Sequence, residues 1–293
     1  MKQRTLKTTT QISGIGVHSG KTVQLTLHPA PLDTGIIFRR IDIHPAVNIP
    51  AISKYVSDTR LNTCLAKDGA MVFTVEHVLS AFAGMGVDNA YVDVTAAEMP
   101  VMDGSAQPFV HLIRAAGIEQ QEAPKKFLRI KRPIKINDGD KFVSIEPFEG
   151  FKFSLTVDFD HPVFRSSSQT ASIDLATTSF ADEISYARTF GFLSDYEQLR
   201  KHNLGLGASL ENTLVLDEQQ VLNPEGLRYA DEFVRHKILD AVGDLYLLGH
   251  NFIGAFTGYK SGHKLNHQLR EAVLADSSAW EIVSKELLAT SFA

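Results

Sequence analysis

The sequence predicts an α+β protein in which one structural unit occurs twice. Its 293 residues are enough for about two domains. The hydrophobic fraction of 44% and the charged fraction of 22% are typical of a chain with a packed core. Two strands, a helix, a strand, a loop and a second helix are predicted in the same order in each half. This repetition indicates an internal duplication.

Alternation of apolar and polar residues predicts three strands in the first half, at 22–28, 36–41 and 90–95. Apolar residues at helical spacing predict two helices, at 74–83 and 107–116. We expect glycines to end both helices, at Gly84 with Gly86 and at Gly117. A turn from Pro29 to Gly35 separates the first two strands, which we therefore expect to pair as a hairpin.

The second half repeats this order, with strands predicted at 142–146, 151–159 and 252–257 and helices at 230–248 and 266–275. A turn from Pro147 to Gly150 again predicts a hairpin. The polar segment 119–126 is the expected linker. The predicted domains are therefore residues 1–122 and residues 127–293.

The spacing of matching residues shows where the halves differ. Pro147 follows Pro29 by 118 positions, whereas His236 follows His77 by 159, so the second half holds about 41 extra residues. They fall within 164–229, and we expect a functional insert at about 188–220.

Composition and charge exclude several classes of protein. The formal net charge of −5, from 29 basic and 34 acidic residues, argues against a nucleic-acid-binding protein. No apolar run approaches the roughly 20 residues of a membrane span, and the N-terminus lacks the apolar core of a signal peptide. We therefore expect a cytoplasmic protein without stable membrane insertion. Cys64 is the single cysteine, which excludes an internal disulfide and a zinc site built from several thiolates.

The helix at 230–248 carries the first candidate chemistry. Its apolar residues share one side, whereas His236, Lys237, Asp240 and Asp244 fall within one arc on the other side. His236 and Asp240 are four positions apart, so both side chains can reach one metal ion. The alternative interpretation is an ordinary solvated face of an amphipathic helix.

The corresponding helix of the first half favours the metal site. Glu76 and His77 point away from its apolar stripe, so equivalent helices of both halves carry ligand-type residues. His77, His236 and Asp240 would form the three-ligand pattern of catalytic zinc, although two histidines and one carboxylate also suit Fe²⁺. Glu76 would then take a proton from the bound water. A loop with glycine-flanked His263 is a further candidate.

Seven segments, in this order, carry a resemblance to a known family: QRTLK with GIGVHSGK, TVEHVLSAFAGMGVDN, MDGSAQPFV, ISYARTFGF, EFVRHKILDAVGDLYLLG and YKSGHKLN. Together they resemble the UDP-3-O-acyl-N-acetylglucosamine deacetylases, zinc enzymes of lipid A biosynthesis in Gram-negative bacteria. The resemblance runs from about residue 2 to about residue 284. It implies two similar domains, each a small sheet plus helices, with the helices packed together between the sheets and an extra β-α-β-like insert in the second domain.

The resemblance also implies a role for each candidate residue. His77, His236 and Asp240 would bind one Zn²⁺ per chain, with Fe²⁺ as the alternative. Glu76 would be the general base, and His263 the general acid supported by Asp244. Thr189 would donate to the oxyanion, and Lys237 would place a cation beside the metal ligands and the phosphates.

The implied substrate is an acylated UDP-sugar bound by a monomer. The residues implied for the nucleotide are Lys141, Phe159, Phe192, Asp195 and Lys260. The residues implied for the acyl-chain passage in the insert are Phe190, Phe192, Tyr196, Leu206, Ala208 and Val215. Relatives commonly have a glycine pair where this chain has Gly207 and Ala208, so its methyl group would narrow the passage.

Two alternatives to this function remain open at this stage. One is a deacylase that acts on another nucleotide sugar through the same site. The other is a nucleotide-sugar-binding protein without activity, although binding alone requires neither Glu76 nor His263.

Overall fold

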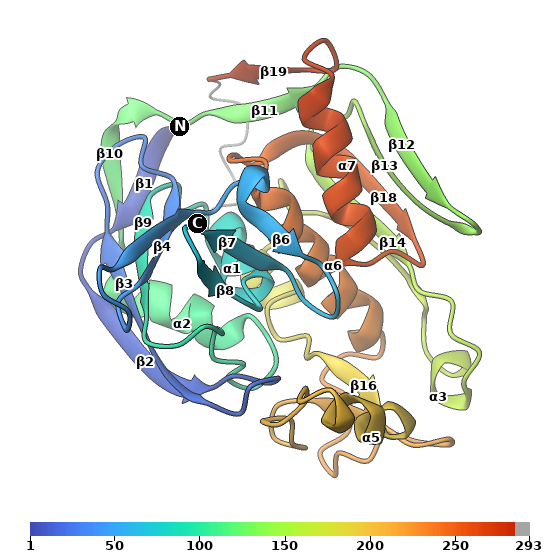
Figure 1. Cartoon of the computed structure of the whole chain (residues 1–293). Helices are drawn as coiled ribbons and strands as arrows, with labels where there is room; N and C mark the ends of the chain where they lie inside the picture. The colour runs from blue at the N-terminus through green and yellow to red at the C-terminus, as the bar shows by residue number, and fades with distance from the viewer. Residues whose placement is uncertain (285–293) are drawn as a thin grey trace.

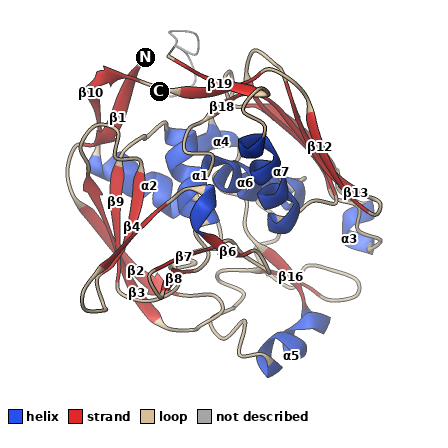
Figure 2. Cartoon of the chain, turned by 45° about the horizontal axis from the view of Figure 1, so that its top comes forward, coloured by secondary structure: helices blue, strands red, loops and turns tan. Residues whose placement is uncertain are grey.

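Two β-sheets enclose a layer of helices in the computed structural model, which describes residues 1–284 (Figures 1 and 2). The first sheet has the strand order β2-β3-β9-β4-β5. Its strands are β2 (Thr10–Ile15), β3 (Thr22–Pro29), β4 (Ile36–Arg40), β5 (Val47–Pro50) and β9 (Ala90–Val94). The α+β class predicted from the sequence is confirmed.

The second sheet repeats this topology with β12 (Ile134–Asp138), β13 (Lys141–Glu146), β18 (Phe252–Tyr259), β14 (Phe151–Thr156) and β15 (Thr170–Asp174). In the first sheet, β9 pairs antiparallel with β3 and parallel with β4. In the second, β18 pairs antiparallel with β13 and parallel with β14. The matching arrangement supports the duplication. Strands β11 (Phe127–Ile130) and β19 (Trp280–Val283) extend the second sheet.

The two expected hairpins are wrong, although their strands exist. The strand that follows the helix enters between the hairpin partners in each half, because β9 separates β3 from β4 and β18 separates β13 from β14. Alternation of apolar and polar residues predicts that a segment is a strand, but it does not predict which strand pairs with it. The burial of β18 along most of its length agrees with its central position in the sheet.

The segment expected to be a linker is a strand. β10 (Ile118–Pro124) pairs antiparallel with β1 (Lys2–Leu6), which joins the start of the chain to the connection between the halves. The polar side chains of β10 gave no sign of a strand in the sequence. The strand lies at the surface and is held by backbone hydrogen bonds, which do not depend on apolar side chains. The boundaries 1–122 and 127–293 remain a prediction, and residues 285–293 of the second lie outside the described residues.

Four main helices lie between the sheets: α1 (Glu76–Met85), α2 (Gln107–Ala116), α6 (Glu232–Tyr246) and α7 (His263–Ala275). Helices α1 and α6 approach closely, because a Cβ atom added at Gly243 would lie 2.0 Å from the carbonyl oxygen of Glu76. Gly84 lies within α1 and packs against Phe180, whereas Gly86, with φ of 69°, ends the helix. The contact between α1 and α6 places the candidate residues of the two halves side by side.

Each half also has an insert outside this core. In the first half, the short helix η1 (Ser53–Tyr55) precedes a small antiparallel sheet of β6 (Val56–Asp58), β7 (Cys64–Lys67) and β8 (Ala70–Val72). In the second half, β16 (Phe190–Phe192), α5 (Leu193–Lys201) and β17 (Leu214–Leu216) form a β-α-β unit with parallel strands. Two short helices, α3 (Pro162–Arg165) and α4 (Phe180–Glu183), precede it. The β-α-β insert agrees with the prediction.

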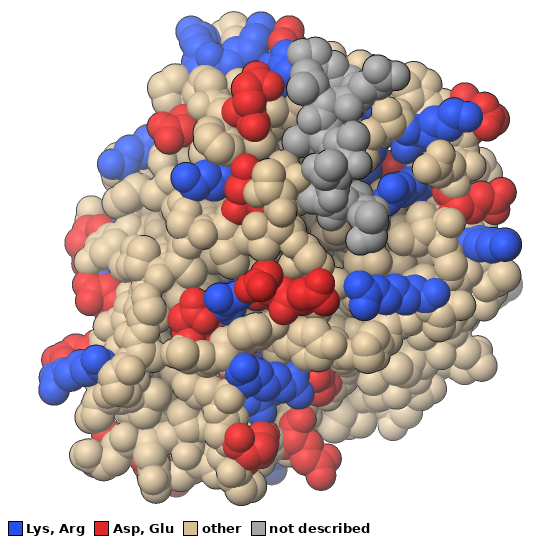
Figure 3. All heavy atoms as spheres, turned by 180° about the vertical axis from the view of Figure 1, so that it is seen from behind, with Lys and Arg blue, Asp and Glu red and all other residues tan. Residues whose placement is uncertain are grey.

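The surface and the helices add two general findings. On the face shown in Figure 3, the described Lys and Arg side chains are interspersed with Asp and Glu side chains. Within residues 1–284, no helix has both the length and the apolar character needed to cross a membrane.

Candidate active site

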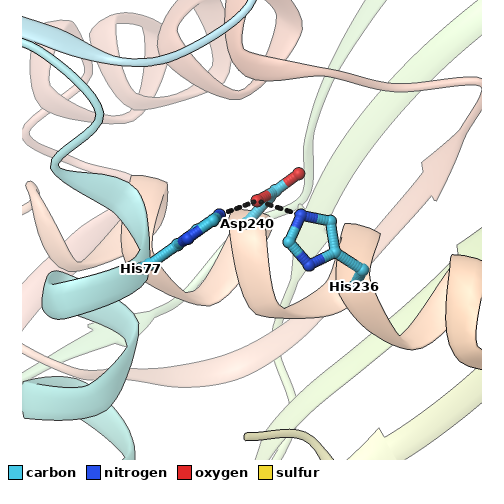
Figure 4. Close-up of side chains that lie close together, drawn as sticks. All are labelled: His77, His236 and Asp240. Atoms are coloured by element: carbon cyan, nitrogen blue, oxygen red, sulfur yellow. Dashed lines mark ion pairs between the residues drawn. The ribbon is translucent and has the colours of Figure 1, made fainter. Parts of the chain in front are cut away.

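Three ligand-type side chains meet where α1 contacts α6. His77 comes from α1, whereas His236 and Asp240 come from successive turns of α6, and the three point toward one another (Figure 4). The Asp240 Oδ1 atom lies 3.6 Å from His77 Nε2 and 3.4 Å from His236 Nε2. One ligand atom from each residue lies within 4.8 Å of the other two. All three residues are buried.

The spacing of these atoms fits a tetrahedral metal ion. Ligand atoms bound at about 2.0–2.1 Å in a tetrahedron lie roughly 3.3–3.4 Å from one another. The two distances to Asp240 Oδ1 are close to this value. A metal ion held by these two imidazole nitrogens and one carboxylate oxygen would keep a fourth position for water or substrate, which is the pattern of catalytic zinc sites.

Neighbouring groups orient two of these candidate ligands. The backbone carbonyl of Ala187 accepts a hydrogen bond from His236 Nδ1 at 3.0 Å, which leaves Nε2 free to bind a metal. Burial lowers the pKa of His236 to about 4, so the imidazole is neutral. Lys237 Nζ donates to Asp240 Oδ2 at 2.6 Å and leaves Oδ1 facing the histidines. Burial alone would raise the pKa of Asp240, but the charge of Lys237 holds it well below its usual value.

Glu76 lies beside this cluster and does not belong to it. Its carboxyl group is buried, and burial raises its pKa. The backbone amide of Thr63 donates to Glu76 Oε2 at 3.0 Å. The other oxygen, Oε1, lies 4.0 Å from His263 Nε2. A buried carboxylate with a raised pKa and one uncommitted oxygen is suited to accept a proton.

His263 is held on its other nitrogen by Asp244. Its Nδ1 atom donates to Asp244 Oδ2 at 2.8 Å. Burial opposes the charged imidazolium, but the carboxylates of Asp244 and Glu76 outweigh it and raise the pKa of His263 to about 9. His263 is therefore a cation at neutral pH with Nε2 directed toward Glu76. It is the first residue of α7, so the expected loop position is wrong and the helix begins three residues earlier than predicted.

The polar arc of α6 is not a solvated face. His236, Asp240 and Asp244 are at most 4% exposed, and the apolar residues opposite them are also buried. The alternative interpretation of this arc is therefore wrong. Lys237, in the same arc, has a side chain that is 20% exposed and pairs with Asp240, and Asp244 pairs with His263.

Thr189 is half-buried just before the insert. Its amide donates to the carbonyl of Gly104, and its carbonyl accepts from the amide of Leu214. The preceding residue, Arg188, is buried and donates to the carboxylate of Glu232 at the start of α6. These bonds fix the strand that follows Ala187 against the helix that carries His236.

Three of the residues implied for the nucleotide lie where neighbouring strands of the second sheet begin or end. Lys141 begins β13, Phe159 follows β14 and Lys260 follows β18, and the register places Phe142 and Thr156 on either side of Tyr259. Lys260 Nζ donates to Asp140 Oδ2 at 2.9 Å and lies 3.0 Å from Asp158 Oδ2, and the hydrogen bonds that these two carboxylates accept raise the pKa of Lys260.

The aromatic residues of the insert extend from the metal cluster. The Phe190 ring lies 6.4 Å from the His236 ring and 5.9 Å from the Phe159 ring, and Phe159 lies 5.7 Å from Phe192. Phe192 also lines a cavity of about 850 Å³, together with Tyr196 and other residues of α5 and with the segment after β17. Val215 lies on β17, between the residues that pair with Phe190 and Phe192.

Three implied residues lie apart from this aromatic group. Asp195 lines a different cavity of about 970 Å³ between α5 and the first half. Leu206 and Ala208 flank Gly207 where the insert contacts residues 16–20, with the Leu206 amide donating to the carbonyl of His18. Residues of α5 therefore line both cavities, with Tyr196 at one and Asp195 at the other.

Sequence reasoning missed Thr63 and Asn266. Asn266 Nδ2 donates to Asp244 Oδ2 at 2.8 Å, and Thr63 Oγ1 donates to Asp244 Oδ1 at 2.5 Å. Asn266 lies three positions after His263, so helical spacing was a usable signal. No pattern in the sequence indicates Thr63, because it lies in a loop of the first half.

Known proteins resemble this chain over nearly its whole length. The profile of the family described as UDP-3-O-acyl N-acetylglycosamine deacetylase matches residues 3–275. The chain is similar to a UDP-3-O-acyl-N-acetylglucosamine deacetylase of Coxiella burnetii (strain Dugway 5J108-111), with 60% identity over 97% of this chain and 94% of the relative. It is also similar to a protein of that name from Pseudomonas entomophila (strain L48), with 57% identity over 99% of this chain and 96% of the relative. The chain belongs to the family of UDP-3-O-acyl N-acetylglycosamine deacetylases.

Proposed function

We propose that this chain performs the reaction of its family, removal of the N-acetyl group of UDP-3-O-acyl-N-acetylglucosamine, at one Zn²⁺ held by His77, His236 and Asp240. The reaction belongs to lipid A biosynthesis, and its products are acetate and the free 2-amino sugar nucleotide. One observation carries the proposal. Glu76 Oε1 and His263 Nε2 face each other across 4.0 Å beside three converging ligand atoms.

The metal ion, when bound, supplies acidity to a coordinated water and polarises the amide carbonyl. The protein supplies the fixed orientation of its ligands. The Ala187 carbonyl sets the tautomer of His236, and Lys237 holds the second oxygen of Asp240. Two imidazoles and one carboxylate are among the ligand sets that bind catalytic zinc.

Glu76 is the proposed general base. Water attacks the acetyl carbonyl as it loses a proton to Glu76 Oε1, while the Thr63 amide holds Oε2. Burial raises the pKa of Glu76 and makes its carboxylate a better acceptor than an exposed one. The developing oxyanion requires a donor, and we assign this role to half-buried Thr189. A well-placed donor of this kind contributes about 3–4 kcal/mol.

His263 is the proposed general acid. The C–N bond breaks when the leaving nitrogen receives a proton, because an amide anion is a poor leaving group. His263 carries that proton on Nε2, and Asp244 stabilises the imidazolium through Nδ1. The proton taken by Glu76 and the proton given by His263 balance the hydrolysis.

The charged and apolar parts of the substrate are assigned to different surfaces. Lys141 and Lys260 offer positive charge to the diphosphate, with Phe159 beside them and Asp195 on α5. Lys237, whose side chain is 20% exposed, adds a cation nearer the metal ligands. The acyl chain is assigned to the apolar insert residues Phe190, Phe192, Tyr196, Leu206, Ala208 and Val215.

Purified protein with measured zinc content tests this function. We expect acetate release from UDP-3-O-acyl-N-acetylglucosamine and very little from UDP-N-acetylglucosamine, which lacks the acyl chain. Similar rates on both would support a less specific deacylase. Binding without acetate release would support an inactive nucleotide-sugar-binding protein.

A further inference from the structure

We propose that Thr63 is a positioning residue that holds the Asp244–His263 pair in a fixed place relative to Glu76. Thr63 lies in the loop between β6 and β7, directly before Cys64, and is fully buried. It belongs to the first half of the chain, whereas Asp244 and His263 belong to the second. The inference rests on the proposed roles of Glu76 and His263.

Two of the three polar groups of Thr63, its backbone amide and its hydroxyl, contact residues assigned to proton transfer. Its backbone amide donates to Glu76 Oε2 at 3.0 Å, and its hydroxyl donates to Asp244 Oδ1 at 2.5 Å. The same hydroxyl oxygen lies 3.4 Å from His263 Nδ1. One residue therefore contacts the base, the acid and the carboxylate that supports the acid.

The loop that carries Thr63 is itself fixed. The Thr63 carbonyl accepts a hydrogen bond from the amide of Val75, immediately before α1. The side chain of the preceding residue, Asn62, accepts from the amide of Thr74. Because Glu76 begins α1, these bonds set the distance between the Thr63 hydroxyl and the base.

The Thr63 hydroxyl fixes the orientation of the Asp244 carboxylate relative to His263. The Asp244 carboxylate receives His263 Nδ1 and Asn266 Nδ2 on one oxygen and the Thr63 hydroxyl on the other. Without the hydroxyl, one buried oxygen of this anion loses its described side-chain donor. The carboxylate can then rotate, and His263 Nε2 loses its alignment with the leaving nitrogen. Binding of the metal and of the substrate does not require this hydroxyl.

The test compares Thr63→Val with Thr63→Ser in the full-length, zinc-loaded protein. Valine keeps the shape and the backbone amide but removes the hydroxyl, whereas serine keeps the hydroxyl. We expect Thr63→Val to lower kcat about 10- to 100-fold, the range of a lost hydrogen bond to a charged group, with KM and zinc content unchanged. We expect Thr63→Ser to keep kcat within about threefold of the wild type.

Two controls separate positioning from stability. Ser80 is fully buried on the helix that carries Glu76, and its hydroxyl has no hydrogen-bond partner among the described residues. Ser80→Ala should leave kcat unchanged. In an Asp244→Asn background, Thr63→Val should lower kcat by less than about twofold, because both changes affect one interaction. Should Thr63→Val unfold, the Thr63→Ala variant takes its place in the same comparison.

The outcomes distinguish this proposal from the proposed function. If kcat of Thr63→Val equals that of the wild type, or if Thr63→Ser is as impaired as Thr63→Val, the positioning role is wrong. The same holds if the losses from Thr63→Val and Asp244→Asn simply add. If Glu76→Gln keeps normal turnover or the wild type releases no acetate, the proposed function fails instead, whatever Thr63→Val does.

Discussion

Glu76 Oε1 and His263 Nε2 lie 4.0 Å apart, although they begin helices α1 and α7 in different halves of the chain. A hydrogen bond fixes each of these side chains through its other polar atom: the Thr63 amide donates to Glu76 Oε2, and His263 Nδ1 donates to Asp244 Oδ2. The gap between them opens beside the cluster of His77, His236 and Asp240. We propose that this arrangement places a proton acceptor, Glu76, and a proton donor, His263, beside one reacting centre.

Removing a metal ligand should lower metal content. We expect His77→Ala and Asp240→Ala proteins to bind well below one zinc per chain, because two remaining ligands hold zinc poorly. Elemental analysis after dialysis measures the content. His111→Ala, which removes an exposed histidine of α2, serves as the control and should retain one zinc per chain. Full zinc content in Asp240→Ala would mean that Asp240 is not a ligand.

Activity should follow a bell-shaped pH profile. We assign the acidic limb to Glu76 together with the zinc-bound water, and the basic limb to His263, which must be protonated to act as the proposed acid. Because the pKa of His263 is raised to about 9, we expect kcat/KM to fall as the pH rises through that region.

Asp244→Asn should shift the basic limb to lower pH. The substitution removes the carboxylate that contributes most to the raised pKa of His263, so the imidazolium loses its proton earlier. Asp276→Asn removes one charge at the far end of α7 and should leave the limb in place. A basic limb unmoved by Asp244→Asn would show that Asp244 does not support His263 in this way.

The insert should make activity depend on the acyl chain. Burial of each CH₂ group contributes about 0.8 kcal/mol, so the loss of about ten such groups should lower kcat/KM by several orders of magnitude. We expect Ala208→Phe to slow long-chain substrates far more than short-chain ones. Leu210→Phe, at an exposed position of the same loop, is the control. Equal activity on acylated and unacylated sugars would contradict the passage.

Close packing of α1 against α6 should be essential to stability. A Cβ atom at Gly243 would lie 2.0 Å from the Glu76 carbonyl oxygen, so Gly243→Ala forces the two helices apart. We expect a loss of about 1–3 kcal/mol in the free energy of unfolding and a lower affinity for zinc. Gly191→Ala, where a Cβ atom has open space, should change the unfolding midpoint little. Equal midpoints for the two variants would contradict the close contact.

The sequence was sufficient to predict α1, α6 and α7 and the ligand-type residues on them, because helical spacing places His236 and Asp240 together. It also predicted the strands that flank Pro29 and Pro147. It did not predict that β9 and β18 enter between them, because strand pairing depends on backbone contacts that residue patterns do not specify. Thr63 was missed for a related reason, since its partner Asp244 is 181 positions away. The packing of α1 against α6, and of α6 against α7, brings them together.

The most direct test of the central claim is acetate release per bound zinc, measured on acylated UDP-sugar for the wild type and Glu76→Ala. Glu76 lies beside the proposed ligands and outside their cluster, so Glu76→Ala should keep one zinc per chain and lose turnover. If Glu76→Ala protein contains no zinc, or if it releases acetate at a near-normal rate, the division between metal ligands and proton acceptor is wrong.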